Sequence, residues 1–249
     1  MHCEKHGIDY EQQTQELFGK SITFGTCPLC DKESDEKRAQ MEAQEEREAL
    51  ISRWKRSGIE ELYYSATLEN YTIETDEQRK AVETVKRMIA SKSGKIVMLG
   101  KNGTGKTHLA VCAVKALGGK IKTMYEISAE IRGTYKDKSP IEEIDYVDDL
   151  ARVPFLVIDE IGRTKGSDAE TNWLSYIIDK RNSRNLPLML ISNKHARKTC
   201  AKNGCPDCLE NYLSEDIMSR LNTDGVLLHF TGDDFRARLR RTTRERSAE

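Results

Sequence analysis

The sequence has no apolar run long enough to cross a membrane and no strong excess of charge of either sign. No eighteen consecutive apolar residues occur, and charged residues begin at Glu4, so neither a membrane-spanning helix nor a signal peptide is expected. The 40 basic and 41 acidic residues give a formal net charge of −1, which excludes a polycation. We therefore expect a cytoplasmic protein without a membrane partner, whose seven cysteines are not in disulfides.

A glycine-rich segment from Gly100 to Thr107 (GKNGTGKT) has the spacing G-x-x-x-x-G-K-[ST] of a phosphate-binding loop. The apolar run 95–99 before it predicts a strand, and 107–117 after it predicts a helix. We expect Lys106 to reach the β- and γ-phosphates of ATP and Thr107 to ligate Mg²⁺. Further cofactor contacts are expected from Gly100, Asn102, Gly103, Thr104, Gly105 and His108. The alternative is a glycine-rich turn that binds no ligand.

Two adjacent carboxylates, Asp159 and Glu160, end the apolar run that begins at Val153. A strand that is buried on both faces reads as a continuous apolar stretch, and its charged residues belong at its carboxyl end. Asp159 is expected to hold Mg²⁺, directly or through water, and Glu160 to act as general base toward the attacking water. Together with the loop, this pair predicts an ATPase.

Alternating apolar runs and amphipathic segments predict an α/β fold, in which a mostly parallel sheet carries helices on both faces. After the loop helix, we expect strands at 120–125, 153–160, 186–193 and 225–230. The expected helices begin at Asp76 and near residues 128, 141, 168 and 214. The segment 31–57, which is rich in Glu, Lys, Arg, Gln and Ala, predicts a solvent-exposed connector helix.

Several motifs share one family pattern: 100–107, 155–162, 190–193, 213–221 and a closing Phe230-x-x-x-Asp234-Phe235-Arg236. On these residues, the chain from Glu69 to about Arg241 resembles the DnaC/IstB group of AAA+ ATPases. The resemblance implies a P-loop AAA+ domain without a separate lid domain. It also implies one of two functions. The first is an ATP-dependent loader of a hexameric replicative helicase, of the phage or bacterial type. The second is an ATPase that assists a transposase on duplex DNA.

The same resemblance implies roles for three polar residues. Asn193 corresponds to sensor 1, Arg220 to an arginine finger that reaches the nucleotide of a neighbouring subunit, and Arg236 to sensor 2. A finger supplied in trans requires self-assembly into an oligomer. The alternatives are a loop cap for Asn193, a solvated helix face for Arg220 and membership of the basic tail for Arg236.

The N-terminus holds Cys3-x-x-His6 and Cys27-Pro-Leu-Cys30, two knuckles with the ligand spacing of a tetrahedral Zn²⁺ site. Thirty residues bury too little to fold alone, so a metal ion is expected to supply the missing free energy. His2 is a rival ligand to His6. Free thiols and a redox pair are the alternatives to zinc.

A second Cys/His group lies between the sensor 1 and arginine-finger motifs. Its possible ligands are His195, Cys200, Cys205 and Cys208, and Cys205-Pro-Asp-Cys208 repeats the knuckle pattern. The family pattern is usually shorter here. A second zinc site is therefore one reading, and a loop histidine beside free thiols is the other.

The chain is expected to divide into a zinc module with its connector (1–58), an AAA+ domain (59–241) and a basic tail (242–249). The zinc module favours a loader over a transposase partner, because it resembles a partner-binding module. Arg132, Tyr135 and Lys136 combine cations and an aromatic ring, as a groove for single-stranded DNA needs, although a solvated helix face has the same composition. A nucleotide-dependent scaffold without turnover is the remaining alternative, which intact Glu160 and Arg220 disfavour.

Overall fold

The structure is a computed structural model, and it describes residues 1–17, 20–135, 142–163, 168–202, 205–213, 215–232 and 234–235. Arg236, Lys136 and the expected basic tail lie outside these residues. The chain forms two compact units, Met1–Arg53 and Trp54–Glu249. None of the helices in the described part of the chain combines the length and hydrophobicity that a bilayer crossing needs.

The N-terminal unit consists of two short antiparallel hairpins and most of one long helix. Strands β1 (His2–Cys3) and β2 (Ile8–Asp9) form the first hairpin, and β3 (Gln13–Leu17) and β4 (Lys20–Phe24) form the second. Helix α1 (Pro28–Arg56) has no buried side chain along its 29 residues, which confirms the expected solvent-exposed helix. Cys27 alone is buried among the side chains described in residues 1–53.

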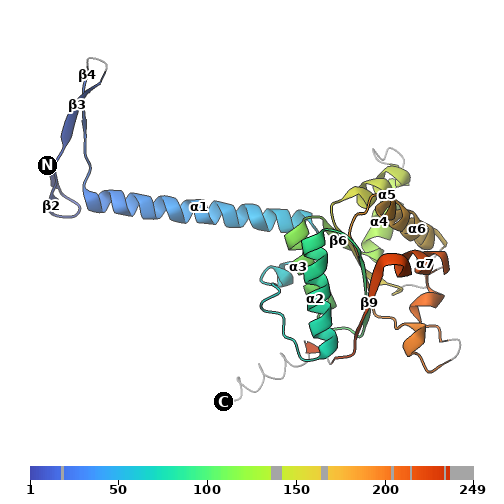
Figure 1. Ribbon diagram of the computed structural model, residues 1–249. Helices are drawn as coiled ribbons and strands as arrows, with labels where there is room; N and C mark the ends of the chain where they lie inside the picture. The colour runs from blue at the N-terminus through green and yellow to red at the C-terminus, as the bar shows by residue number, and fades with distance from the viewer. Residues whose placement is uncertain are drawn as a thin grey trace. The chain divides into compact units, whose positions relative to one another are not determined.

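The second unit is built on a five-stranded parallel sheet with the strand order β6-β7-β8-β5-β9. The expected parallel sheet is thereby confirmed. Figure 1 labels its two edge strands, β6 and β9. Its strands, in chain order, are β5 (Lys95–Gly100), β6 (Lys120–Thr123), β7 (Leu156–Ile161), β8 (Leu188–Ser192) and β9 (Gly225–Phe230).

Helices cover both faces of the sheet, as the apolar strands require. Along β5, Ile96 and Met98 pack with α2 (Asp76–Ser91) and α3 (Lys106–Leu117), whereas Val97 and Leu99 face the other core. That second core is closed by α4 (Met124–Thr134), α5 (Glu143–Arg152), α6 (Asp168–Ser183) and α7 (Glu215–Asp224). Three short 3₁₀ helices complete the unit: η1 (Glu61–Tyr63), η2 (Arg197–Thr199) and η3 (Leu209–Asn211).

The sequence-based expectation for the start of α4 is wrong. The helix begins at Met124, not near residue 128, and β6 ends at Thr123. The reason is a capping box: the Thr123 hydroxyl accepts a hydrogen bond from the Glu126 backbone N–H, and the Glu126 carboxylate accepts one from the Thr123 N–H. The apolar residues that suggested a longer strand are the first turn of the helix.

A buried arginine ties α6 to the loops that lead into β7 and β8. Arg181 is fully buried, and its guanidinium donates to the carbonyls of Ala151, Val153, Pro154 and Pro187 at 2.6–3.3 Å. Burial lowers the pKa of Arg181 to about 10, so the side chain stays protonated at neutral pH. These carbonyls lie at the end of α5 and in the loops before β7 and β8, and the Arg181 guanidinium donates to all four.

We expect Arg181→Met to destabilise the second unit, because it leaves buried carbonyls without donors. The free energy of unfolding, measured by urea denaturation, should fall by about 2–5 kcal/mol. Arg184→Met, an exposed arginine in the turn that directly follows the same helix, is the matched control and should change stability little. Equal stabilities of the two variants would contradict this account of Arg181.

Candidate functional site

A cleft of about 460 Å³ lies where the carboxyl ends of β5, β7 and β8 meet. Its lining includes nearly every residue that the nucleotide motifs predicted: Asn102, Gly103, Thr104, Gly105, Lys106, Thr107, His108, Asp159, Glu160 and Asn193. Gly100 lies just behind the loop, where a Cβ atom would fall 2.1 Å from the Phe230 carbonyl oxygen. Polar residues at the carboxyl ends of three strands therefore line one cavity.

The loop from residue 100 to 107 needs glycine for two reasons. Gly103 and Gly105 have φ values of 75° and 92°, in the left-handed region that side chains disfavour. A Cβ atom at Gly103 would also fall 1.8 Å from Asp234 Oδ1, and one at Gly105 would fall 2.7 Å from the Tyr71 ring. The backbone can therefore curl toward the cavity only because these positions carry no side chain.

Lys106 is held inside the curl of the loop. Its side chain is almost fully buried, and Nζ donates to the carbonyl oxygens of Gly100 at 2.7 Å and Lys101 at 2.6 Å. The ammonium group is thus fixed beside the loop N–H groups at the start of α3. A phosphate oxygen that enters the loop meets a positive charge whose position is already set.

The Thr107 hydroxyl and the Asp159 carboxylate form the contact that joins α3 to β7. Thr107 Oγ1 donates to Asp159 Oδ2 at 2.9 Å, and the Glu160 backbone N–H donates to Asp159 Oδ1 at 2.6 Å. Burial raises the pKa of Asp159, and these two hydrogen bonds oppose that rise. Two hard oxygen ligands stand together here, as a Mg²⁺ ion requires.

Glu160 has an unusual backbone for a non-glycine residue, with φ at 58°. The register between β7 and β8 shifts between Ile158 and Ile161, so the strand is irregular at this point. The Glu160 carboxylate lines the cleft and also pairs with Arg163 three residues on. The strand distortion directs a second carboxylate to the cavity beside Asp159.

Asn193 follows the last residue of β8 and lines the same cleft. The preceding Ser192 is buried, and its hydroxyl donates to the Ile161 carbonyl at 2.5 Å. This bond fixes the end of β8 against the end of β7, so the position of Asn193 is set relative to Glu160.

Sequence reasoning missed the other wall of the cleft, which comes from residues 62–78. Tyr71 packs edge-on against His108 with 5.3 Å between ring centroids, and its hydroxyl donates to the Thr104 carbonyl at 3.3 Å. His108 Nε2 also lies 2.8 Å from the Thr67 carbonyl. This segment contains no recognised motif. Its tyrosines are unusual for a connecting segment and could have indicated that it packs against the rest of the unit.

Arg220 lies on α7 and is not among the residues that line the cleft. Its guanidinium pairs with Asp179 and with Asp216, whose Oδ2 is 2.9 Å away, and it donates to Ser175 Oγ at 3.2 Å. The side chain is 31% exposed.

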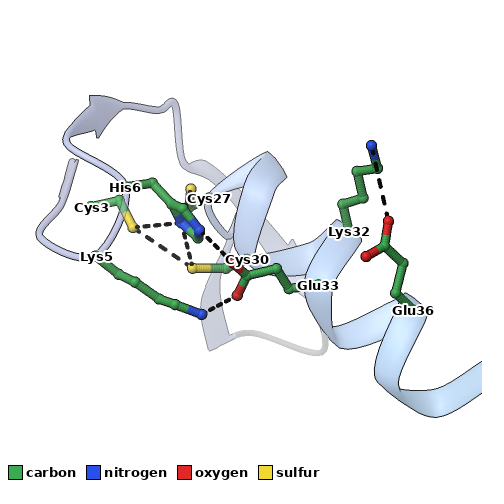
Figure 2. A network of polar contacts seen from close by, with 8 residues as sticks. All are labelled: Cys3, Lys5, His6, Cys27, Cys30, Lys32, Glu33 and Glu36. Atoms are coloured by element: carbon green, nitrogen blue, oxygen red, sulfur yellow. Dashed lines mark hydrogen bonds and ion pairs between the residues drawn. The ribbon is translucent and has the colours of Figure 1, made fainter. Parts of the chain in front are cut away.

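The four N-terminal residues with metal-ligand spacing lie together (Figure 2). The Sγ atoms of Cys3, Cys27 and Cys30 are 3.4–3.6 Å from the same nitrogen, Nδ1 of His6. One imidazole nitrogen makes a single hydrogen bond, so it cannot satisfy three thiols. Ligand atoms around tetrahedral Zn²⁺ stand roughly 3.5–3.8 Å apart, given bond lengths of about 2.0–2.3 Å. The group therefore fits a shared Zn²⁺ ion.

A carboxylate orients the histidine of this group. His6 Nε2 donates to Glu33 Oε1 at 2.9 Å, which leaves Nδ1 with a free lone pair toward the thiols. Lys5 also pairs with Glu33, and the hydrogen bonds from Lys5 and His6 hold the pKa of its carboxyl at about 2. His2 pairs with Asp9 and is not in the group, so the choice of His6 agrees with the geometry.

The second set of predicted ligands also lies together, in the ATPase unit. One ligand atom from each of His195, Cys200, Cys205 and Cys208 lies within 4.8 Å of the others. Cys112, in contrast, is buried in the core on α3 and belongs to neither group.

Comparisons with known proteins bear on the ATPase unit. The family model for IstB-like ATP-binding proteins matches residues 36–243. The replicative helicase loader DnaC of Buchnera aphidicola subsp. Schizaphis graminum is 33% identical over 194 residues, which cover 74% of this chain and 75% of the relative. DnaC of Escherichia coli K12 is 31% identical over 193 residues, which cover 74% of each chain. The N-terminal Cys/His group lies outside the residues that the family model matches.

Solved structures show the same fold at lower identity. The crystal structure of the DnaC helicase loader has a TM-score of 0.58 at 21% identity and covers 69% of this chain and 99% of that one. AMPPCP-bound DnaA from Aquifex aeolicus has a TM-score of 0.56 at 20% identity and covers 75% and 57%, respectively. The fold is therefore that of AAA+ proteins.

We expect Gly103→Ala to distort the phosphate-binding loop, because its Cβ atom would collide with Asp234 at a left-handed φ. The dissociation constant for a fluorescent ATP analogue should rise at least about tenfold. Gly133→Ala, on α4 with open space around the added carbon, should leave it unchanged. Lys106→Ala gives the reference level for a loop that cannot hold phosphate. Unchanged affinity of Gly103→Ala would contradict the role given to this loop.

Proposed function

This chain belongs to the family of IstB-like ATP-binding proteins, and from that premise we propose that it is an ATP-dependent loader of a hexameric replicative helicase. Its DnaC relatives carry the name of helicase loaders, and about three quarters of their length aligns with this chain. The observation that carries the proposal is the convergence of Lys106, the Thr107–Asp159 pair and Glu160 in one cleft.

The residues of the cleft divide the work of ATP hydrolysis. Lys106 and the loop N–H groups bind the phosphates, and Thr107 and Asp159 would hold Mg²⁺, which would neutralise charge on the phosphate oxygens. Glu160 takes a proton from the attacking water, and Asn193 orients that water against the γ-phosphate. The Glu160 carboxylate also pairs with Arg163 through one oxygen, Oε1.

Arg220 acts on the nucleotide of a neighbouring copy. The Lys95 ammonium at the start of β5 donates to the Arg220 carbonyl at 3.0 Å and pairs with Asp224, which fixes this end of α7. The phosphate-binding loop follows the other end of the same strand, about 16 Å away for five steps of about 3.3 Å. An arginine side chain does not span that distance to its own cleft. ATP hydrolysis therefore needs self-assembly, with each interface completing one site.

The N-terminal module binds the helicase and is folded by Zn²⁺. The ion would be held by Cys3, His6, Cys27 and Cys30. Its binding would supply folding free energy that the side chains described in this module, of which only Cys27 is buried, do not supply. Its charged helix α1 leads directly into the ATPase unit, so a partner bound to the module is tethered to the site of hydrolysis.

Single-stranded DNA is the third partner of the proposed loader. Arg132 and Tyr135 are exposed at the carboxyl end of α4, and the exposed Tyr125 lies on its first turn. Aromatic rings beside a cation suit stacking with unpaired bases. An ATPase that assists a transposase on duplex DNA is the alternative function, and the N-terminal Cys/His group favours the loader over it.

We expect Glu160→Gln to retain ATP binding without hydrolysis, and Arg220→Ala to do the same for a different reason. When the two variants are mixed, an Arg220→Ala subunit supplies an intact Glu160, and a Glu160→Gln neighbour supplies an intact Arg220. Such an interface is complete, so ATPase activity should return in the mixture although neither variant is active alone. Arg152→Ala, an exposed arginine on α5, should leave activity near that of the unmutated protein. Mixtures that co-assemble but stay inactive would contradict action in trans.

We expect Cys27→Ser to abolish binding of the replicative helicase, because loss of a ligand unfolds the module. Co-purification of the helicase with the full-length variant measures this directly. ATP hydrolysis should persist, since the cleft lies in the other unit. Ser34→Ala, on the exposed face of α1, is the control and should still bind. Full helicase binding by Cys27→Ser would refute the role of the module, and preferred stimulation by duplex DNA with a transposase would favour the alternative function.

A further inference from the structure

The second Cys/His group lies in the segment between Asn193 and α7, and the proposed ATPase mechanism does not use it. We propose that His195, Cys200, Cys205 and Cys208 bind one Zn²⁺ ion, and that this ion braces the segment that joins the end of β8 to the helix carrying Arg220. The metal site stands on its own geometry. Its bracing role in catalysis rests on the proposed ATPase function.

The four side chains form a compact set of soft ligands. Cys205 Sγ lies 3.5 Å from His195 Nε2, which matches the separation of sulfur and nitrogen ligands on one tetrahedral Zn²⁺ ion. All four ligand atoms lie within 4.8 Å of one another. Cys208 is 2% exposed, so the cluster has one buried wall. Three thiols and an imidazole are a ligand set of structural zinc sites.

The backbone around the group brings the ligands together from both ends of the loop. His195 and Cys208 are paired as an isolated parallel bridge. The Leu209 N–H donates to the His195 carbonyl at 2.9 Å, and the His195 N–H donates to the Asp207 carbonyl at 3.2 Å. The side-chain amide of Asn211 donates from Nδ2 to the Cys205 carbonyl at 2.6 Å and holds the tight turn of the Cys-Pro-Asp-Cys knuckle.

The described part of this loop has no hydrophobic core of its own. Between Ala196 and Cys208, which are both buried, none of the described side chains is buried, and most are exposed. Apolar burial is the usual driving force for ordering a loop, and here it is missing. A bound metal ion supplies that free energy in short segments of this composition.

The position of the group connects two residues that the mechanism requires. Asn193 is two residues before His195, and Leu209 and Leu213, which follow the knuckle, pack in the same core as Ile217 of α7. Lys194 also crosses to the knuckle, where its Nζ donates to the Pro206 carbonyl at 3.3 Å. Loss of the ion would therefore loosen both Asn193 and the approach to Arg220, while the phosphate-binding loop stays intact.

The first test counts metal ions in full-length protein purified without chelators. Elemental analysis should give two zinc ions per chain, and Cys205→Ser and Cys27→Ser should each lose one of them. Cys112→Ala removes a core thiol that belongs to neither group, so it should keep both ions. Cobalt substitution should show thiolate-to-metal charge-transfer absorption that falls in Cys205→Ser. One ion in the unmutated protein that Cys205→Ser retains, or a Cys205–Cys208 disulfide, would overturn the second site.

The second test addresses the brace. Amide hydrogen exchange across residues 194–213 should be faster in Cys205→Ser than in the unmutated protein. Cys200→Ser should show the same change, because it removes a different ligand of the same ion, so an effect peculiar to position 205 is ruled out. The ATPase kcat should fall at least about fivefold, with the affinity for ATP changed by less than about twofold. A lost ion with unchanged exchange and unchanged kcat would overturn the brace. If the unmutated protein hydrolyses no ATP, the proposed function fails, whereas ion count and exchange still decide this inference.

Discussion

Strands that are buried on both faces leave only their ends for polar side chains, and this constraint organises the ATPase unit. β5, β7 and β8 are apolar along their length because helices cover both sides of the sheet. The strands are parallel, so their carboxyl ends meet at one edge. The contact between Thr107 and Asp159 at 2.9 Å closes that edge by joining the loop helix to β7. The cleft is a consequence of this arrangement.

The same edge also explains the local irregularities of the structure. The left-handed backbone of Glu160 and the register shift beside it occur where β7 must turn a carboxylate toward the cavity. After the shift, Ile161 pairs with Ser192, whose hydroxyl also donates to the Ile161 carbonyl. Strain of this kind persists only when the surrounding packing holds it, and here both neighbouring strands do so.

Apolar burial is unevenly distributed along this chain, and the two Cys/His groups occur where it is scarce. Residues 1–53 have Cys27 as the one buried residue among the side chains described there, and the described residues between Ala196 and Cys208 include no buried one. In our proposals, metal ligation by thiols and an imidazole takes the place of hydrophobic contacts in both segments. Under the same proposals, one group folds the module that binds a partner, and the other stiffens the connection between Asn193 and Arg220.

The sequence by itself determined the parallel sheet, the phosphate-binding loop and the carboxylates of β7, because strand periodicity and glycine spacing are local properties. It also indicated both sets of candidate metal ligands, because the spacing of cysteines within a knuckle can be read from a few consecutive residues. It placed the start of α4 wrongly, since a capping box outweighed the apolar residues that resembled a strand. Only the tertiary structure decided that Tyr71 closes the cleft and that Arg181 holds four carbonyls. It also decided that Arg220 lies at the far end of β5 from its own loop. These relations join residues distant in sequence, and long-range packing sets them.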